Sequence, residues 1–128
     1  MEQTSARAHT ILVIDDEPDI RRLLQLALED AGYLVRTAHE GGQGLAIAKQ
    51  GDCTLAIVDL FMPGKEGLET ILALRCAIPS MKLIAISGGS GDTDMLTVAK
   101  SFGADLTIHK PFDLDKLLRS VATLLETH

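Results

Sequence analysis

Aromatic side chains, cysteine and positive charge are all scarce in this 128-residue chain. Three phenylalanines, one tyrosine and no tryptophan are too few for a platform that stacks nucleic-acid bases. The net charge of −6 argues against nucleic acid or an anionic membrane as a partner, because both attract clustered Lys and Arg. No apolar run approaches the length of a membrane-spanning helix. These absences indicate a soluble protein.

The two cysteines, Cys53 and Cys76, form no CxxC pair and have no histidine at metal-ligand spacing. We therefore expect both to be small apolar residues in a reducing compartment, and the protein to be cytoplasmic. The first nine residues are polar and are not a signal peptide. Because the length fits one domain, we expect a flexible tail over 1–9 and a single domain over 10–126. We expect this domain to be a monomer or a weak dimer.

Short continuous runs rich in Ile, Leu and Val recur along the chain. They occupy 10–14, 54–58, 83–87 and 106–109. Such runs are typical of strands that are covered on both faces. The run over 34–38 is more polar and suits an edge strand.

Between these runs, apolar residues at helical spacing predict five helices. Pro18 is favourable in a first turn, Gly32 and Gly103 are good helix stops, and Asp113 is a plausible N-cap. The pattern is least clear over about 40–50, where three glycines lower the helix propensity. The apolar stripes of the first and third helices are formed by Ile20, Leu23, Leu24, Ala27 and Leu28, and by Leu68, Ile71 and Leu72.

Alternating strands and helices predict an α/β domain, in which a doubly wound parallel sheet has helices on both faces. In open sheets of this kind, ligands bind beyond the carboxyl ends of the strands. The candidate site should therefore lie where the apolar runs end.

Five polar residues stand at those ends: Asp15, Asp16, Asp59, Ser87 and Lys110. Parallel strands would bring three carboxylates, one hydroxyl and one ammonium to the same edge. This set of groups can bind a hard cation and a phosphoryl group, and a carboxylate can accept phosphate covalently.

The motifs around these residues match a known family in order and position. They are VIDDE at 13–17, VDLFMPG at 58–64, ISG at 86–88, GAD at 103–105 and KPF at 110–112. From residue 10 to 126 the chain resembles the receiver domain of two-component response regulators. The resemblance implies a flavodoxin-like fold with five helices and strand order 2-1-3-4-5.

The resemblance also implies roles for the polar residues. Asp59 would accept the phosphoryl group, and Mg²⁺ would be held by Asp15, Asp16, Asp59 and the backbone carbonyl of Phe61. Carboxylates this close repel one another, so without metal at least one of their pKa values should rise.

Lys110 would pair with Asp59 before phosphoryl transfer and with a phosphate oxygen after it. The Ser87 hydroxyl would bond to the phosphoryl group, and the small Gly88 would leave room for it. In the family the bond corresponding to Lys110–Pro111 is usually cis.

Two positions depart from common patterns. Thr107 stands where the family usually has Tyr or Phe, so a ring flip at that position cannot relay the signal. The glycine-rich segment 88–91 is then the expected route. Phe61 stands where aspartyl phosphohydrolases carry a second Asp, and it cannot transfer a proton. We therefore expect a phospho-protein that persists.

The resemblance implies a signalling module and not an enzyme in its own right. A histidine kinase or a phosphotransfer protein would supply the phosphate, and a target protein would bind a face spanning about 91–126. No direct contact with nucleic acid or membrane is expected. The possible contact charges on that face are Asp92, Asp94, Lys100, Asp105, Lys116 and Arg119.

Other interpretations remain open at the level of sequence. Taken singly, Asp15 and Asp16 are most simply the acidic start of a helix, and Asp59 the start of a turn. The whole set also allows a small Mg²⁺-dependent phosphohydrolase, a cofactor-binding module of flavodoxin-like fold, or a receiver-like interaction module that needs no phosphate. Phe61 disfavours the first, the acidic residues 15–17 disfavour the second, and Thr107 keeps the third open.

Overall fold

The computed structural model describes residues 9–60, 66–88 and 93–126. Strands and helices alternate through these ranges. In chain order they are β1 (Thr10–Ile14), α2 (Pro18–Asp30), β2 (Leu34–Ala38), α3 (Gly41–Ala48), β3 (Leu55–Asp59), α4 (Glu66–Ala77), β4 (Lys82–Ser87), α5 (Thr93–Phe102), β5 (Leu106–His109) and α6 (Leu114–Glu126).

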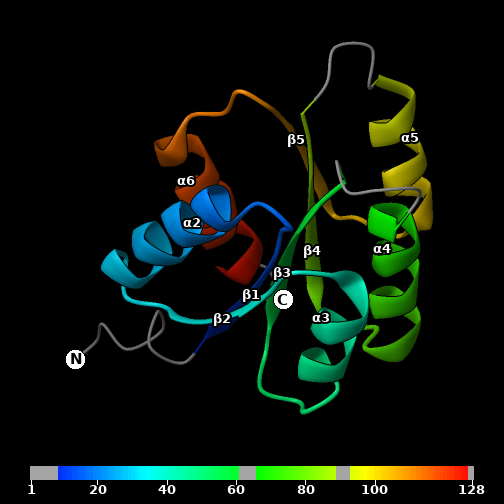
Figure 1. Ribbon diagram of the computed structural model, residues 1–128, viewed down its shortest axis with the longest axis horizontal. Helices are drawn as coiled ribbons and strands as arrows, with labels where there is room; N and C mark the ends of the chain where they lie inside the picture. The colour runs from blue at the N-terminus through cyan, green and yellow to red at the C-terminus, as the bar shows by residue number, and fades with distance from the viewer. Residues whose placement is uncertain (1–8, 61–65, 89–92, 127–128) are drawn as a thin grey trace.

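All five strands form one parallel sheet in the order β2-β1-β3-β4-β5 (Figure 1). In the register, Ile14 pairs with Val58, and Ser87 pairs with His109. The carboxyl ends of β1, β3, β4 and β5 are therefore nearly level. The predicted fold class, strand order and edge position of the strand at 34–38 are confirmed.

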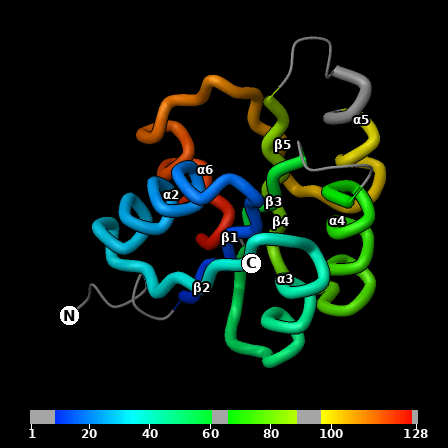
Figure 2. The backbone as a smooth tube through the Cα atoms, in the orientation of Figure 1, coloured from blue at the N-terminus to red at the C-terminus, as the bar shows by residue number. Residues whose placement is uncertain are grey.

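Helices cover both faces of this sheet. In Figures 1 and 2, α2 and α6 lie on one side, and α3, α4 and α5 lie on the other. Two apolar clusters fill the spaces between the layers; Leu24 and Leu117 belong to the first, and Ile71 and Ala99 to the second. Because the central strands face a helix layer on each side, their sequences are apolar without alternation.

The helix α3 forms in spite of its glycines because its first turn is capped and its packing requires small residues. The Glu40 side chain accepts from the Gly42 amide at 2.6 Å, and Glu66 accepts from the Gly41 amide at 2.7 Å. A Cβ at Gly41 would collide with Thr70 Oγ1. The glycines that dilute helix propensity thus allow the helix to approach α4 closely.

Helix ends follow the predicted signals. Pro18 is in the first turn of α2, and Gly32 after its end has a positive φ of 103°. Asp113 accepts from the Asp115 amide at 2.9 Å at the start of α6. Among the described residues, no helix is both long enough and apolar enough to span a membrane.

Three residues expected in apolar surroundings are exposed. Leu23 is 45% exposed and Leu72 is 44% exposed, although both belong to apolar stripes. The surface of each helix that packs against its neighbours is narrower than the apolar stripe of the helix. One residue at the edge of the stripe therefore faces solvent. Cys53 is buried, whereas Cys76 is exposed near the end of α4.

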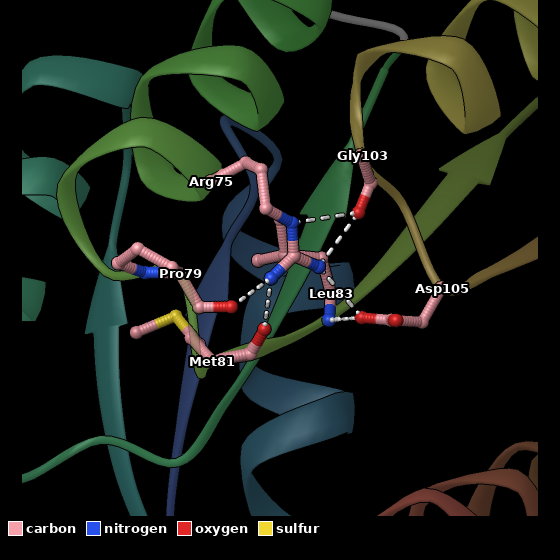
Figure 3. A network of polar contacts seen from close by, with 6 residues as sticks. All are labelled: Arg75, Pro79, Met81, Leu83, Gly103 and Asp105. Carbon is pink, nitrogen blue, oxygen red and sulfur yellow. Dashed lines mark hydrogen bonds and ion pairs between the residues drawn. The ribbon is translucent and has the colours of Figure 1, made fainter.

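Arg75 on α4 joins the amino-terminal sides of β4 and β5 (Figure 3). Its guanidinium donates to the carbonyls of Gly103, Pro79 and Met81 at 2.7–3.1 Å. It also pairs with Asp105 Oδ2 at 2.8 Å. This network lies at the end of the sheet away from the candidate site, and Asp105 is already engaged in it.

Candidate functional site

The level strand ends bring the candidate residues together. Asp59 is the last residue of β3, Ser87 is the last of β4, and Lys110 directly follows β5. The Lys110 amide donates to the Ser87 carbonyl at 2.7 Å. Asp15 follows β1, and its amide donates to the Ala38 carbonyl at 3.1 Å, which extends the pairing with β2 by one residue. Four adjacent strands therefore contribute to one site.

Most of these side chains are buried. Asp15, Asp59 and Ser87 are each 1% exposed, and the Lys110 side chain is 17% exposed. The Lys110 ammonium lies 3.3 Å from Asp59 Oδ2. A buried carboxylate is costly unless a partner offsets its charge, and the Lys110 ammonium contributes such an offset for Asp59.

Asp15 is held less completely. Its Oδ1 accepts from the Glu17 amide at 2.9 Å, but its buried Oδ2 has no hydrogen-bond partner among the described residues. Burial raises the pKa of Asp15 to about 7, and the negative charge of Asp59 adds to the rise. The predicted rise in a carboxyl pKa is confirmed, although burial contributes more to it than repulsion does.

The structure groups Asp15, Glu17 and Asp59 closely enough for one ion, with one ligand oxygen of each lying within 4.8 Å of the others. Glu17 was not among the predicted ligands, although it follows the acidic pair in VIDDE. Asp16 is exposed and is not in this group, and Phe61 lies outside the described residues. An all-oxygen donor set with a buried, unsatisfied carboxylate oxygen fits a hard cation such as Mg²⁺.

Lys110 is constrained from several directions. Its Nζ lies 3.8 Å from Glu17 Oε1, so it stands between an exposed and a buried carboxylate. A Cβ at Gly88 would lie 3.0 Å from Lys110 Cδ, so a larger residue at 88 would press on the lysine. The Lys110–Pro111 peptide is cis, as the resemblance implies.

Thr107 lies in β5 and is half-buried. A groove of about 410 Å³ runs past it, between β5 and the start of α6. A second, mostly apolar groove of about 600 Å³ adjoins the candidate site, because Lys110 lines it together with Ile20 and Phe112.

Comparisons with known proteins agree on one family. A family model described as the response regulator receiver domain matches residues 11–122. The uncharacterized transcriptional regulatory protein YkoG of Bacillus subtilis is 35% identical over 115 residues, which are 90% of this chain and 50% of YkoG. The chain therefore spans about half the length of this curated relative.

Solved structures give the same result. A response regulator receiver domain protein (CheY-like) from Methanospirillum hungatei superposes with a TM-score of 0.87 at 30% identity, covering 94% of this chain and 95% of that one. A response regulator from Burkholderia pseudomallei, solved with a phosphorylated aspartic acid, a calcium ion and citrate, has a TM-score of 0.79 at 27% identity. That match covers 93% of this chain and 73% of the Burkholderia chain.

Proposed function

Since this chain belongs to the response regulator receiver domain family, we propose that it accepts a phosphoryl group on Asp59 and thereby switches its contacts with other proteins. A histidine kinase or a phosphotransfer protein is the donor. The receiver unit spans 10–126 and acts in the cytoplasm. The observation that carries the proposal is the buried Asp59 carboxylate at the end of β3, with the Lys110 ammonium 3.3 Å away.

In the transfer step, a carboxylate oxygen of Asp59 attacks the donor's phosphorus. The P–N bond to the donor imidazole breaks, and its electron pair stays on the nitrogen, which takes up a proton. A carboxylate is a poor nucleophile, so the rate depends on positioning and on charge neutralisation. Lys110 supplies both, because it holds Asp59 in place and can then follow the negative charge onto a phosphate oxygen.

Asp15, Asp16 and Asp59, with the carbonyl of Phe61, are the groups proposed to hold Mg²⁺. A bound ion would neutralise negative charge on the phosphoryl oxygens during the transfer. The unsatisfied Oδ2 of Asp15 supports the role of Asp15, because a cation would give that buried oxygen the partner it lacks among the described residues.

After transfer, the Ser87 hydroxyl donates to the phosphoryl group, and Gly88 leaves the space beside Lys110 that the group needs. The new hydrogen bond draws Ser87 towards the phosphoryl group. This movement alters the face spanning about 91–126, where a target protein binds. Since Thr107 has no ring to flip, we propose that the segment 88–91, of which 89–91 lie outside the described residues, transmits the change.

The direct test is phosphorylation by a small donor. The chain is incubated with Mg²⁺ and acetyl phosphate, and its intact mass is measured over time. The wild type should gain one phosphoryl group and keep it long enough to be isolated, whereas Asp59→Asn should gain none. No gain in the wild type would refute the proposed function, and an equal gain in Asp59→Asn would mean that another residue is the acceptor.

A further inference from the structure

The proposed function assigns no role to Glu17, although its carboxylate stands with those of Asp15 and Asp59 in the group that could hold one ion. Glu17 precedes α2 as the N-cap residue, yet its side chain makes no capping hydrogen bond. The side chain instead lies 3.8 Å from the Lys110 ammonium. Its carboxylate is therefore directed to the site and is not required by the helix.

Exposure increases from Asp59 to Glu17. Asp59 is 1% exposed, the Lys110 side chain 17%, and the Glu17 side chain 60%, while ligand oxygens of Asp59 and Glu17 lie within 4.8 Å of each other. In an in-line displacement, the leaving group is on the side of phosphorus that faces away from the attacking oxygen. Because Asp59 is the buried end, a departing group faces the solvent side, where Glu17 adds a negative charge.

We propose that Glu17 is a specificity-determining residue, which selects donors whose leaving group is a protonated nitrogen over donors whose leaving group is a carboxylate. This inference rests on the proposed function of Asp59. Phosphohistidine and phosphoramidate transfer by breaking a P–N bond, and the nitrogen departs with a proton. An acyl phosphate transfers by breaking a P–O bond, and the electron pair leaves on a carboxylate anion. Glu17 repels that anion and attracts an N–H.

Glu17 also shares the Lys110 ammonium with Asp59 before transfer. A change at Glu17 that acted only through Lys110 or through the metal would alter the rates with both kinds of donor equally. Donor preference, measured as the ratio of the two rates, separates selection at the leaving group from these general effects.

The experiment measures initial rates of phosphorylation with acetyl phosphate and with phosphoramidate, each at saturating Mg²⁺. In Glu17→Gln, the rate with acetyl phosphate should rise about fivefold, the equivalent of about 1 kcal/mol for two solvated unit charges about 4 Å apart. The rate with phosphoramidate should stay the same or fall. The change in the ratio should shrink as ionic strength is raised, because exposed charges are screened.

Two further variants act as controls. Glu17→Asp keeps the charge and should keep the wild-type preference. Glu29→Gln removes the same charge from an exposed position at the other end of α2 and should leave both rates unchanged. An unchanged ratio in Glu17→Gln, or the same change in Glu29→Gln, would overturn the inference. If the wild type accepted phosphate from neither donor, or Asp59→Asn accepted it equally, the proposed function itself would fail.

Discussion

The two ends of the sheet use charged side chains in opposite ways. At the amino-terminal side of β4 and β5, the Arg75 guanidinium donates to three carbonyls and pairs with Asp105, which also accepts from the Leu83 amide at 2.8 Å (Figure 3). At the carboxyl ends, Asp15 and Asp59 share one buried space, and Asp15 Oδ2 has no partner among the described residues.

The end of the sheet around Arg75 contributes to the stability of the fold, whereas the end around Asp59 is suited to binding a ligand. The network around Arg75 is satisfied within the chain, so it stabilises the fold and has little to offer a ligand. The described residues around Asp59 include the carboxylates of Asp15 and Glu17 and the single ammonium of Lys110, so we expect a bound cation to stabilise the site. Buried negative charge that costs free energy in the protein alone would then stabilise the complex with a cation.

The largest expected effect concerns pH and Asp15. Without metal, its carboxyl is protonated in both states below pH 3.8 and ionised in both above about 7, so between these values only the folded state retains the proton. The free energy of unfolding should therefore fall as pH rises through this window. Asp15→Asn should lose this dependence and be more stable than the wild type at pH 8, by on the order of 4 kcal/mol.

The measurement is urea unfolding of both variants at a series of pH values, in the presence of a chelator. The two stabilities should converge towards pH 4. A constant difference between the variants across the whole range would contradict a raised pKa for Asp15.

The next effect is that of Mg²⁺ on the same two proteins. At pH 8 and a Mg²⁺ concentration of about 100 times Kd, the wild type should gain about 2.7 kcal/mol, because the ion binds only the folded state. Asp15→Asn should gain far less, since it lacks one of the anionic ligands. Thermal unfolding with and without Mg²⁺ measures this, and equal gains would exclude Asp15 as a ligand.

The smallest effect belongs to the other end of the sheet. Arg75→Met keeps an apolar side chain but removes every hydrogen-bond donor of the guanidinium. It should therefore lower the free energy of unfolding by about 2 kcal/mol. The loss should be the same at pH 5 and pH 8, and Mg²⁺ affinity and the phosphorylation of Asp59 should not change. Unfolding curves and Mg²⁺ titration of this variant test the comparison, which fails if metal binding weakens along with stability.

Much of this arrangement could be predicted from local sequence. The apolar runs predict strands because covered strands need no polar face, and the polar residues after them mark the functional edge. Helix ends at Pro18, Gly32 and Asp113 were predictable since backbone geometry and capping depend on neighbouring residues. Membership of the family was predictable for the same reason, because its motifs are short and contiguous.

Other features depend on residues far apart in the chain. Arg75 reaches a carbonyl 28 residues away and a carboxylate 30 residues away, and no periodicity indicates such a contact. The exposure of Leu23 was not predicted, because the apolar stripe of a helix does not show how much of that stripe the neighbouring sheet and helices cover. The position of Glu17 beside Lys110 was not predicted, because the sequence does not show which of the three adjacent acidic residues at 15–17 lies next to the lysine.

The amino-acid sequence alone determined the α/β class, the strand ends and most of the chemical groups at the candidate site, since these follow from hydrophobic pattern and local motifs. Only the tertiary structure decided how those groups share charge. Burial leaves Asp15 Oδ2 without a partner among the described residues, and strand register sets Lys110 between Asp59 and Glu17. Desolvation and distance have no signature in sequence, because both are properties of the packed molecule.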